Sequence, residues 1–311
     1  MISVDELYPR DQLVFRDVGL RDGLQMVRTF PTTEQKKRWI EIAYAAGVRN
    51  FEIGSYLPAA RYPQFADIEQ IVTEGMAIAD IRLGALILNK RGALRALDAK
   101  VHEIMFVVSA SEAHNLANAN RSREETLREI QEAIALRDEL GVKPVASVAI
   151  AMSFGCSISG KSSVTRRDVF EIVGKALDAG ADVINIADTV GYAGPSEVRE
   201  MTRAFLSEFG DVPLAFHFHD TRGLGLANAA MALDEGVSIL DASMGGLGGC
   251  PFAPGATGNI VFEDLVFLAD TMGIETGIDP VALTELRELM AEAMPGEQTY
   301  GQLRRAGMPK P

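Results

Sequence analysis

Short apolar segments alternate with helical segments along nearly the whole chain, and this alternation limits the possible fold more than any other feature. Eight segments rich in β-branched and other apolar residues have the length of buried strands. They span residues 13–17, 50–54, 82–88, 103–109, 145–152, 183–187, 214–219 and 239–244. Eight strands that each lead into a helix predict an α/β fold, the (β/α)8 or TIM barrel. An open doubly wound sheet is the alternative, but no Gly-x-Gly-x-x-Gly motif follows the first strand.

Six predicted helices end at a glycine that leads toward the next segment. They cover residues 33–46, 122–140, 166–179, 195–209, 223–235 and 258–272. Glycine readily adopts the left-handed conformation that closes many helices. An additional C-terminal helix is expected over 279–294, followed by a tail from 295 that is expected to be partly mobile. We therefore expect a single catalytic domain over 1–311, with the barrel over about 11–273 and the C-terminal helix and tail over 274–311.

The charge balance and cysteine content argue against several classes of function. Lys and Arg total 30 against 43 Asp and Glu, which gives a formal net charge of −13. This balance argues against binding to nucleic acid or to an anionic membrane surface. No apolar stretch approaches the roughly 20 residues of a membrane-spanning helix. The presence of only two cysteines, together with an N-terminus that lacks signal-peptide features, favours a cytoplasmic protein.

Polar residues gather where several predicted strands end, and two of them form the sharpest local motif. His217 and His219 flank Phe218 at the end of the seventh strand. Because side chains alternate along a strand, both imidazoles point to one side of the sheet and the phenylalanines point to the other, toward the helices. Active residues of such barrels lie at this end. The pair predicts a divalent-metal site, and two hydrogen-bonded core histidines are the alternative.

Two further residues would complete a mixed nitrogen and oxygen ligand set. Asp22, after the first strand, offers a carboxylate, and Asn259, after the eighth, offers an amide oxygen. With His217 and His219 they suit Mg²⁺ or Mn²⁺ better than a structural zinc ion. Taken singly, Asp22 is also able to cap a turn, and Asn259 to cap the last barrel helix.

A charged pair is predicted beside this site. Glu52 lies in an apolar strand, where a carboxylate is costly unless it is paired. Arg21, on the neighbouring strand end, is the preferred partner. Beside a metal, Arg21 would stabilise a developing enolate oxygen, whereas a surface ion pair is the simpler interpretation.

A glycine-rich loop follows the eighth strand and carries Cys250. Residues 245–259 contain six glycines, more than turn formation requires. Such a loop is able to close over a ligand, and a cysteine beside a cation is suited to catalytic acid or base chemistry. An inert buried cysteine is the alternative, and for Cys156 both interpretations stay open.

Three segments closely resemble 3-hydroxy-3-methylglutaryl-CoA lyase. They are Gly19-Leu20-Arg21-Asp22-Gly23-Leu24-Gln25, Phe216-His217-Phe218-His219-Asp220 and Ser243-Met244-Gly245-Gly246-Leu247-Gly248-Gly249-Cys250-Pro251-Phe252. The resemblance extends over about residues 13–273. The Arg-Asp and His-x-His elements are shared with the wider group of metal-dependent aldolase barrels, which includes isopropylmalate and citramalate synthases. The glycine loop with its cysteine is specific to the lyase branch.

The resemblance implies a role for each residue and a reaction. The matching positions are the metal ligands Asp22, His217, His219 and Asn259, the enolate-stabilising Arg21, the supporting Glu52, the loop acid Cys250, and the substrate-binding Gln25, Asn118 and Ser122. His217 or Asp22 is the expected base. The implied enzyme is a divalent-metal-dependent lyase that cleaves an acyl-CoA, 3-hydroxy-3-methylglutaryl-CoA or a similar compound, to acetyl-CoA and acetoacetate. In the family this reaction belongs to leucine degradation and ketone-body metabolism, and the expected assembly is a homo-oligomer, a dimer.

Three departures from the lyase pattern lie where the substrate is expected. Met26 and Val27 replace the usual Asn-Glu, the fifth strand reads Ala149-Ile150-Ala151 where the lyase branch usually carries a Tyr and a Ser, and Asn185 stands where a Ser is expected. A different acyl group, as in citramalyl-CoA or a longer analogue, is therefore one alternative. A condensing synthase, a metal-dependent hydrolase and a non-catalytic binding protein are the others; barrel hydrolases usually carry His-x-His on the first strand, which weighs against the hydrolase.

Overall fold

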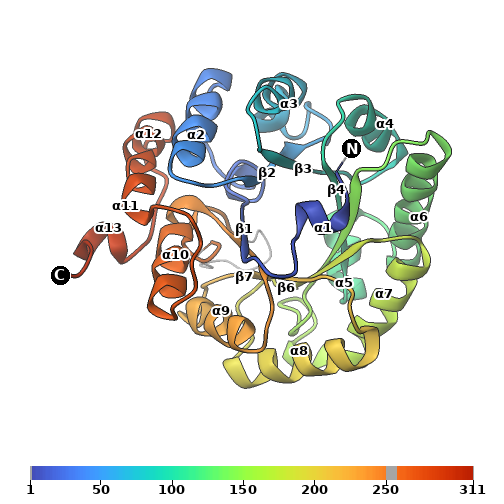
Figure 1. Ribbon diagram of the computed structural model, residues 1–311. Coiled ribbons are helices and arrows are strands. Elements are labelled where there is room, and N and C mark those ends of the chain that lie inside the picture. Colours follow the sequence, from blue (N-terminus) through green and yellow to red (C-terminus); the bar gives the residue numbers. More distant parts are fainter. Residues whose placement is uncertain (1, 250–257, 311) are drawn as a thin grey trace.

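All eight predicted strands are present, and they close into a barrel. In the computed structural model, which describes residues 2–249 and 258–310, each strand runs parallel to its neighbours and β1 pairs with β8 (Figure 1). The strands are β1 Val14–Asp17, β2 Asn50–Ser55, β3 Arg82–Leu86, β4 Glu103–Ser109, β5 Val145–Ala151, β6 Val183–Asp188, β7 Leu214–Phe218 and β8 Ile239–Ala242. This confirms the predicted (β/α)8 fold.

Helices connect consecutive strands around the outside of the barrel (Figure 1). They are α2 Thr33–Ala45, α3 Ile68–Met76, α4 Lys90–Asp98, α5 Glu112–Ala119, α6 Arg123–Glu139, α7 Arg166–Asp178, α8 Pro195–Phe209, α9 Gly225–Asp234 and α10 Phe262–Thr271. Helices α3, α4 and α5 lie outside the predicted ranges. Helix α3 nevertheless has a helical signal, because Ile68, Ile71, Val72 and Gly75 are buried at spacings of three and four.

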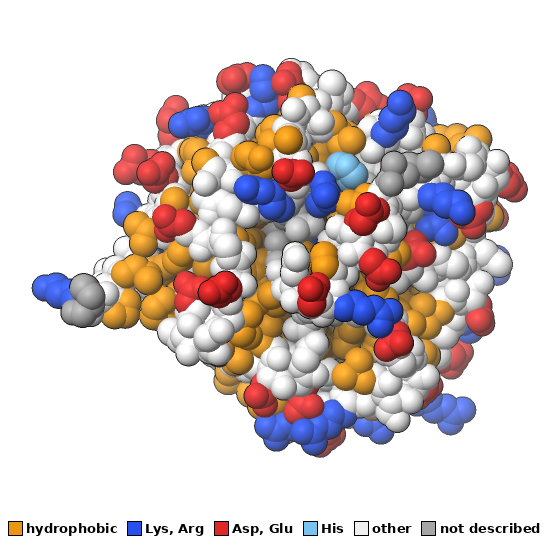
Figure 2. Space-filling view, viewed as in Figure 1, with side chains coloured by type: hydrophobic (Ala, Val, Ile, Leu, Met, Phe, Trp, Pro, Cys, Tyr) orange, Lys and Arg blue, Asp and Glu red, His pale blue; other side chains and the backbone are white. Residues whose placement is uncertain are grey.

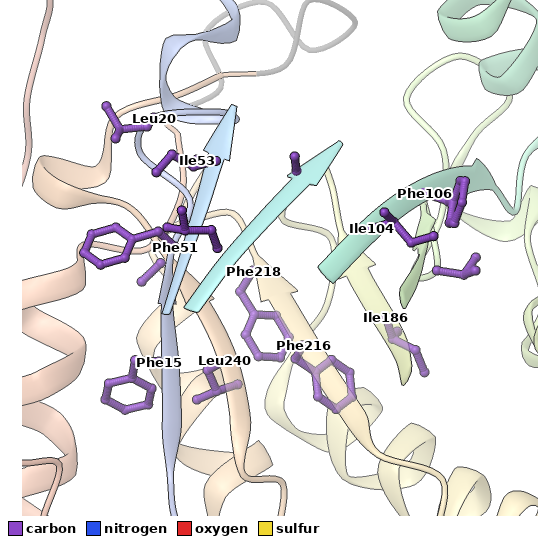
Figure 3. Packing of buried hydrophobic residues seen from close by; sticks show 14 of the residues in the cluster. Phe15, Leu20, Phe51, Ile53, Ile104, Phe106, Ile186, Phe216, Phe218 and Leu240 are labelled. Atoms are coloured by element: carbon purple, nitrogen blue, oxygen red, sulfur yellow. The ribbon is translucent and has the colours of Figure 1, made fainter. Parts of the chain in front are cut away.

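The main core fills the space between the strands and these helices. On β7, Phe216 and Phe218 project from the same face, with ring centroids 5.1 Å apart (Figure 3). Both rings are fully buried in this core, and Phe216 also stacks against Phe154. The alternation of side chains therefore holds as predicted, and it sends His217 to the interior of the barrel.

A short N-terminal helix covers the end of the barrel where the strands begin. Helix α1, Val4–Leu7, starts with a capping box between Ser3 and Glu6. Leu7 and Tyr8 pack against residues at or next to the start of several strands, Val14, Val145, Val183, Ala215 and Ile239. Helix α1 thus lies across this end (Figure 1), and the opposite end remains for the site.

The chain after β8 differs from the predicted pattern. The strand ends at Ala242 instead of 244, and α10 begins at Phe262 instead of 258. Just before α10 the chain is extended, because Asn259 bridges His219 and Val261 bridges Ser243. This pairing carries Asn259 to the end of β7, which a helix start at 258 would not do.

The segment beyond the barrel forms three short helices instead of one. Helices α11 Pro280–Leu283 and α12 Leu286–Ala293 replace the single predicted helix, and α13 Leu303–Ala306 lies in the tail. The break lets both α11 and α12 pack against α2. The tail is fastened near the site, since Tyr300 N donates to Gly245 O at 2.7 Å and Gln302 N donates to an Asp264 carboxylate oxygen at 2.7 Å.

Charged side chains of both signs are mixed over the face seen in Figure 2. Lys and Arg lie among Asp and Glu, and they form no continuous basic patch on this face. Among the helices in residues 2–249 and 258–310, none combines the length and the apolar character needed to cross a membrane.

Candidate active site

Most of the predicted site residues line one cavity at the end of the barrel where the strands finish. Those that line it are Arg21, Asp22, Gln25, Glu52, Asn118, His217 and His219. Asn259 is buried directly beside Asp22. Cys250 lies outside the described residues, so its predicted role is not addressed by the geometry.

Asp22, His217 and His219 bring three possible ligand atoms within 4.8 Å of one another. The Nε2 atoms of the two imidazoles are 3.1 Å apart. Asp22 Oδ2 lies 3.9 Å from His217 Nε2 and 3.7 Å from His219 Nε2. Neighbouring ligands of an octahedral cation with bonds of about 2.1 Å are about 3.0 Å apart. The imidazole pair therefore has the spacing of two neighbouring ligands, and the carboxylate oxygen lies slightly beyond it.

The amide of Asn259 extends this cluster. Its Nδ2 donates to Asp22 Oδ2 at 2.8 Å and to the Leu247 carbonyl at 3.0 Å. Its Oδ1 is buried and has no hydrogen-bond partner among the described residues. An unpartnered buried carbonyl oxygen is costly, and a cation would satisfy it. The donor set of one carboxylate, two imidazoles and one amide oxygen thus fits a divalent cation such as Mg²⁺ or Mn²⁺.

The electrostatics of Asp22 and His219 favour the protonation states that metal binding requires, whereas at His217 the carboxylates of Asp241 and Asp22 outweigh burial and raise the pKa. Burial disfavours the charged form of Asp22, but Arg21 and the two imidazoles outweigh it and lower the pKa of this carboxyl to about 2. Burial and the neighbouring His217 lower the pKa of His219 to about 4. An ionised carboxylate beside a neutral imidazole is the combination that binds a cation.

Arg21 forms the predicted pair with Glu52. Its Nε lies 2.5 Å from Glu52 Oε1, and its Nη1 lies 2.7 Å from Asp22 Oδ1. The same Nη1 donates to Gln25 Oε1 at 3.4 Å. Although burial opposes it, the two carboxylates raise the pKa of the guanidinium above its usual value. A permanently charged arginine is therefore held beside the cluster of Asp22, His217 and His219.

Asn118 and Ser122 have different surroundings. Asn118, near the end of α5, is half-buried and lines the cavity. Ser122 does not line it, and its hydroxyl caps α6 by donating to Glu125 Oε2 at 2.8 Å and accepting from Glu125 N at 3.2 Å. The capping box is thus the role that the geometry gives Ser122.

The cavity also contains Asp241 and His114, which were not expected from the sequence. Asp241 is a carboxylate within the apolar strand β8, the same signal that drew attention to Glu52, and it lies 3.1 Å from His217 Nδ1. His114 on α5 lies 3.0 Å from Ser109 Oγ, and burial lowers its pKa to about 4. A lone histidine outside any recognised motif has no sequence signal that separates it from a core residue.

One wall of the cavity is apolar. It includes Leu86 and Met105 from β3 and β4, and Ala149 and Ala151 from β5. The departure noted on the fifth strand therefore faces the cavity, where Ala149 and Ala151 present methyl groups.

The comparisons with known proteins agree with this geometry. A family model described as HMGL-like matches residues 12–290. The (R)-citramalyl-CoA lyase of Chloroflexus aurantiacus is 40% identical over 280 residues, which cover 86% of each chain. The hydroxymethylglutaryl-CoA lyase of Bacillus subtilis is 32% identical over 287 residues, 92% of this chain and 94% of that one.

A solved structure extends the similarity to three dimensions. An HMG-CoA lyase from Acinetobacter baumannii, in complex with coenzyme A and 3-methylmalate, has a TM-score of 0.88 and 37% identity, with 100% of both chains covered. The chain belongs to the HMGL-like family. It is a carbon–carbon lyase.

Proposed function

We propose that this lyase cleaves 3-hydroxy-3-methylglutaryl-CoA, or a closely similar 3-hydroxyacyl-CoA, with the help of Mg²⁺ or Mn²⁺. The observation that carries the proposal is the convergence of Asp22, His217 and His219 beside Arg21 in one cavity. These side chains come from segments about 200 residues apart in the sequence. The stability of a barrel does not require two imidazoles, a carboxylate and a guanidinium to share a pocket.

A bound cation would lower the pKa of the substrate's tertiary hydroxyl and stabilise negative charge on the enolate. Asp22, His217, His219 and Asn259 would hold it. The remaining chemistry is assigned to side chains of the chain itself.

The first of these tasks is to accept the proton of the tertiary hydroxyl, and Asp22 and His217 are the candidates. Both carboxylate oxygens of Asp22 are engaged, one with Arg21 Nη1 at 2.7 Å and the other with Asn259 Nδ2 at 2.8 Å. His217 lines the cavity. The Nε2 lone pair of His217 is used by the cation, whereas Oδ1 of Asp22 keeps a lone pair beside the one that Arg21 contacts, so we assign the proton to Asp22.

Arg21 acts on the second part of the reaction. As the hydroxyl loses its proton, its oxygen becomes the carbonyl of a keto acid, the C2–C3 bond breaks, and the electron pair passes to the thioester enolate. The Arg21 guanidinium stabilises the enolate oxygen, and Glu52 keeps it in place. A proton from Cys250 or from water then reaches the enolate carbon and gives acetyl-CoA.

A substrate panel tests the proposal. The protein is incubated with Mn²⁺ and with 3-hydroxy-3-methylglutaryl-CoA, citramalyl-CoA and longer analogues, and acetyl-CoA and the keto acid are measured. We expect acetyl-CoA from at least one substrate, loss of the reaction with a chelator, and recovery on adding Mn²⁺. Failure to cleave every substrate refutes the proposal, and consumption of acetyl-CoA with a 2-oxo acid would establish a synthase.

A single substitution tests the part given to the loop cysteine. We expect Cys250→Ala to lower turnover, because the enolate carbon then takes its proton from water alone. Undiminished turnover would remove the acid role from Cys250 and leave the metal site unaffected.

Citramalyl-CoA is the second candidate substrate, and the apolar wall favours it. Its hydroxyl and carboxylate share one carbon, so both oxygens are directed at the metal cluster and only a methyl group is left to meet Ala149 and Ala151. Pyruvate rather than acetoacetate is then the keto acid released. Ala151→Ser should shift the ratio of the two activities toward 3-hydroxy-3-methylglutaryl-CoA, whereas Ile150→Val, on the helix-facing side of β5, should leave the ratio unchanged.

We also propose a cytoplasmic homodimer as the working form. The low cysteine content supports the location, and the resemblance to the lyases supports the assembly. Light scattering coupled to size-exclusion chromatography measures the mass directly, and a mass of one 33.6 kDa chain would contradict the dimer.

A further inference from the structure

A row of buried polar side chains crosses three neighbouring strands beside the proposed metal site of Asp22, His217 and His219. Arg16 on β1 is the register partner of Asp241 on β8, and Asp241 is the register partner of His217 on β7. Arg16 is 1% exposed and Asp241 is 2% exposed. Such groups are tolerated inside a protein only when they are paired.

Asp241 is the centre of this row, and both of its oxygens are engaged. Oδ1 accepts from Arg16 Nε at 2.7 Å. Oδ2 accepts from Asn185 Nδ2 at 2.7 Å and lies 3.1 Å from His217 Nδ1. Three different elements therefore determine the orientation of one carboxylate.

The row continues to the opposite end of the barrel. Arg16 Nη1 donates to Tyr8 Oη at 2.9 Å and to Glu103 Oε1 at 3.2 Å. Tyr8 Oη donates to Glu103 Oε2 at 2.7 Å. Arg16 is thus held between the carboxylates of Asp241 and Glu103. Tyr8, the residue that follows α1, contacts the same guanidinium that orients Asp241.

We propose that Asp241 is the positioning residue of the metal site, and that Arg16 holds it in place. Asp241 Oδ2 accepts a hydrogen bond from Nδ1–H of His217, so that the proton stays on Nδ1 and Nε2 is left unprotonated toward Asp22 and His219. This role rests on the metal site of the proposed function.

The chemistry of the two side chains explains why a carboxylate is needed. A neutral imidazole carries its proton on one nitrogen only, and the partner of one nitrogen decides the state of the other. An ionised carboxylate is an acceptor only, so it selects the Nδ1–H tautomer. Such partners of metal-binding histidines raise metal affinity by orienting the ring.

Asp241→Asn tests this role with little change in shape. The single carbonyl oxygen of the new amide is expected to remain with the charged Arg16, so that the NH₂ group faces His217. That group donates to Nδ1 and drives the imidazole proton to Nε2, where the cation must bind. Asp182→Asn is the matched control, because Asp182 pairs with Arg137 at 2.6 Å and does not line the cavity.

Two measurements that do not depend on enzyme activity test the role of Asp241: the position of the His217 proton and the affinity for Mn²⁺. Long-range ¹H–¹⁵N correlation spectra of the metal-free protein report which imidazole nitrogen carries the proton; the chain has four histidines, and His217→Gln identifies the signal of His217. We expect Nδ1–H in the wild type and Nε2–H in Asp241→Asn. Calorimetric titration with Mn²⁺ should show an affinity about 10- to 100-fold weaker in Asp241→Asn and unchanged in Asp182→Asn.

The outcomes separate this inference from the proposed function. A wild type that binds Mn²⁺ but carries the His217 proton on Nε2 overturns the role of Asp241, and this result needs no variant to fold. A folded Asp241→Asn with wild-type Mn²⁺ affinity overturns it as well. A wild type that binds no Mn²⁺ refutes the metal site, and with it the role of Asp241.

Discussion

Nε of Arg21 lies 2.5 Å from Oε1 of Glu52, and this contact joins the segment after β1 to the interior face of β2. The side chains are 11% and 1% exposed, so solvent screens the pair only weakly. Because the same guanidinium contacts Asp22 at 2.7 Å, Glu52 also influences the position of Asp22, which it does not touch.

Glu52→Gln should weaken both stability and catalysis. The substitution removes one of the two charges that compensate the buried Arg21, so we expect the free energy of unfolding to fall by about 3 kcal/mol. We also expect kcat to fall at least tenfold, because the guanidinium is no longer held beside the enolate. Denaturant titration and steady-state assays measure the two effects. Glu197→Gln, which breaks the exposed pair with Lys161 at 2.9 Å, is the control and should change neither.

Asp22→Asn should abolish metal binding without unfolding the protein. An amide cannot supply the negative charge that a divalent cation needs. The loss of Mn²⁺ affinity should therefore exceed the roughly 100-fold upper limit expected for Asp241→Asn, which does not bind the cation itself. Calorimetric titration with Mn²⁺ checks the expectation, with circular dichroism to confirm the fold. Unchanged affinity would show that the cluster of Asp22, His217 and His219 is not the metal site.

Ser122→Ala and Asn118→Ala should have opposite effects. Ser122 caps α6, so its loss should cost about 1 kcal/mol of stability and leave kcat/KM unchanged. Asn118 lines the cavity, so its loss should raise KM with little effect on stability. If Ser122→Ala instead raises KM at unchanged stability, the substrate role implied by the family resemblance is correct after all.

His114 should make the protein less stable in mild acid. Burial lowers its pKa to about 4, whereas the unfolded chain protonates it near 6.5. Between these values the unfolded state binds more protons, so stability is lost as the pH falls. Going from pH 8 to pH 5 should cost the wild type about 2 kcal/mol more than His114→Gln. Denaturant titrations of both metal-free proteins test this, and equal losses would contradict it.

Gly47→Ala should destabilise the fold more than Gly141→Ala. Both glycines follow a helix with positive φ, at 107° and 65°. An added Cβ at Gly47 would overlap the carbonyl oxygen of Gly277, whereas one at Gly141 meets nothing within 4 Å. We expect about 1 kcal/mol for Gly141→Ala from the backbone alone, and a clearly larger loss for Gly47→Ala. Equal losses in thermal and denaturant unfolding would show that the contact with Gly277 is unimportant.

Features encoded by short-range patterns were predictable from the sequence. The period of two in β7 placed His217 and His219 on the interior face and the phenylalanines on the other. The cost of burying a lone carboxylate was enough to pair Glu52 with Arg21. The same reasoning was available for Asp241, whose strand is equally apolar, but its partners on β1 and β7 become visible only when the barrel closes.

The sequence by itself determined the eight strands, the direction of their side chains and the residue types available at their ends, because these depend on local periodicity and on the chemistry of single residues. The tertiary structure decided which of those residues meet. Barrel closure brings β8 beside β1 and so places Arg16 against Asp241. The extended pairing of Asn259 with His219 replaces a helix start, and the cap of α6 takes Ser122 out of the site. Such contacts depend on register and closure between distant segments, and no local pattern carries that information.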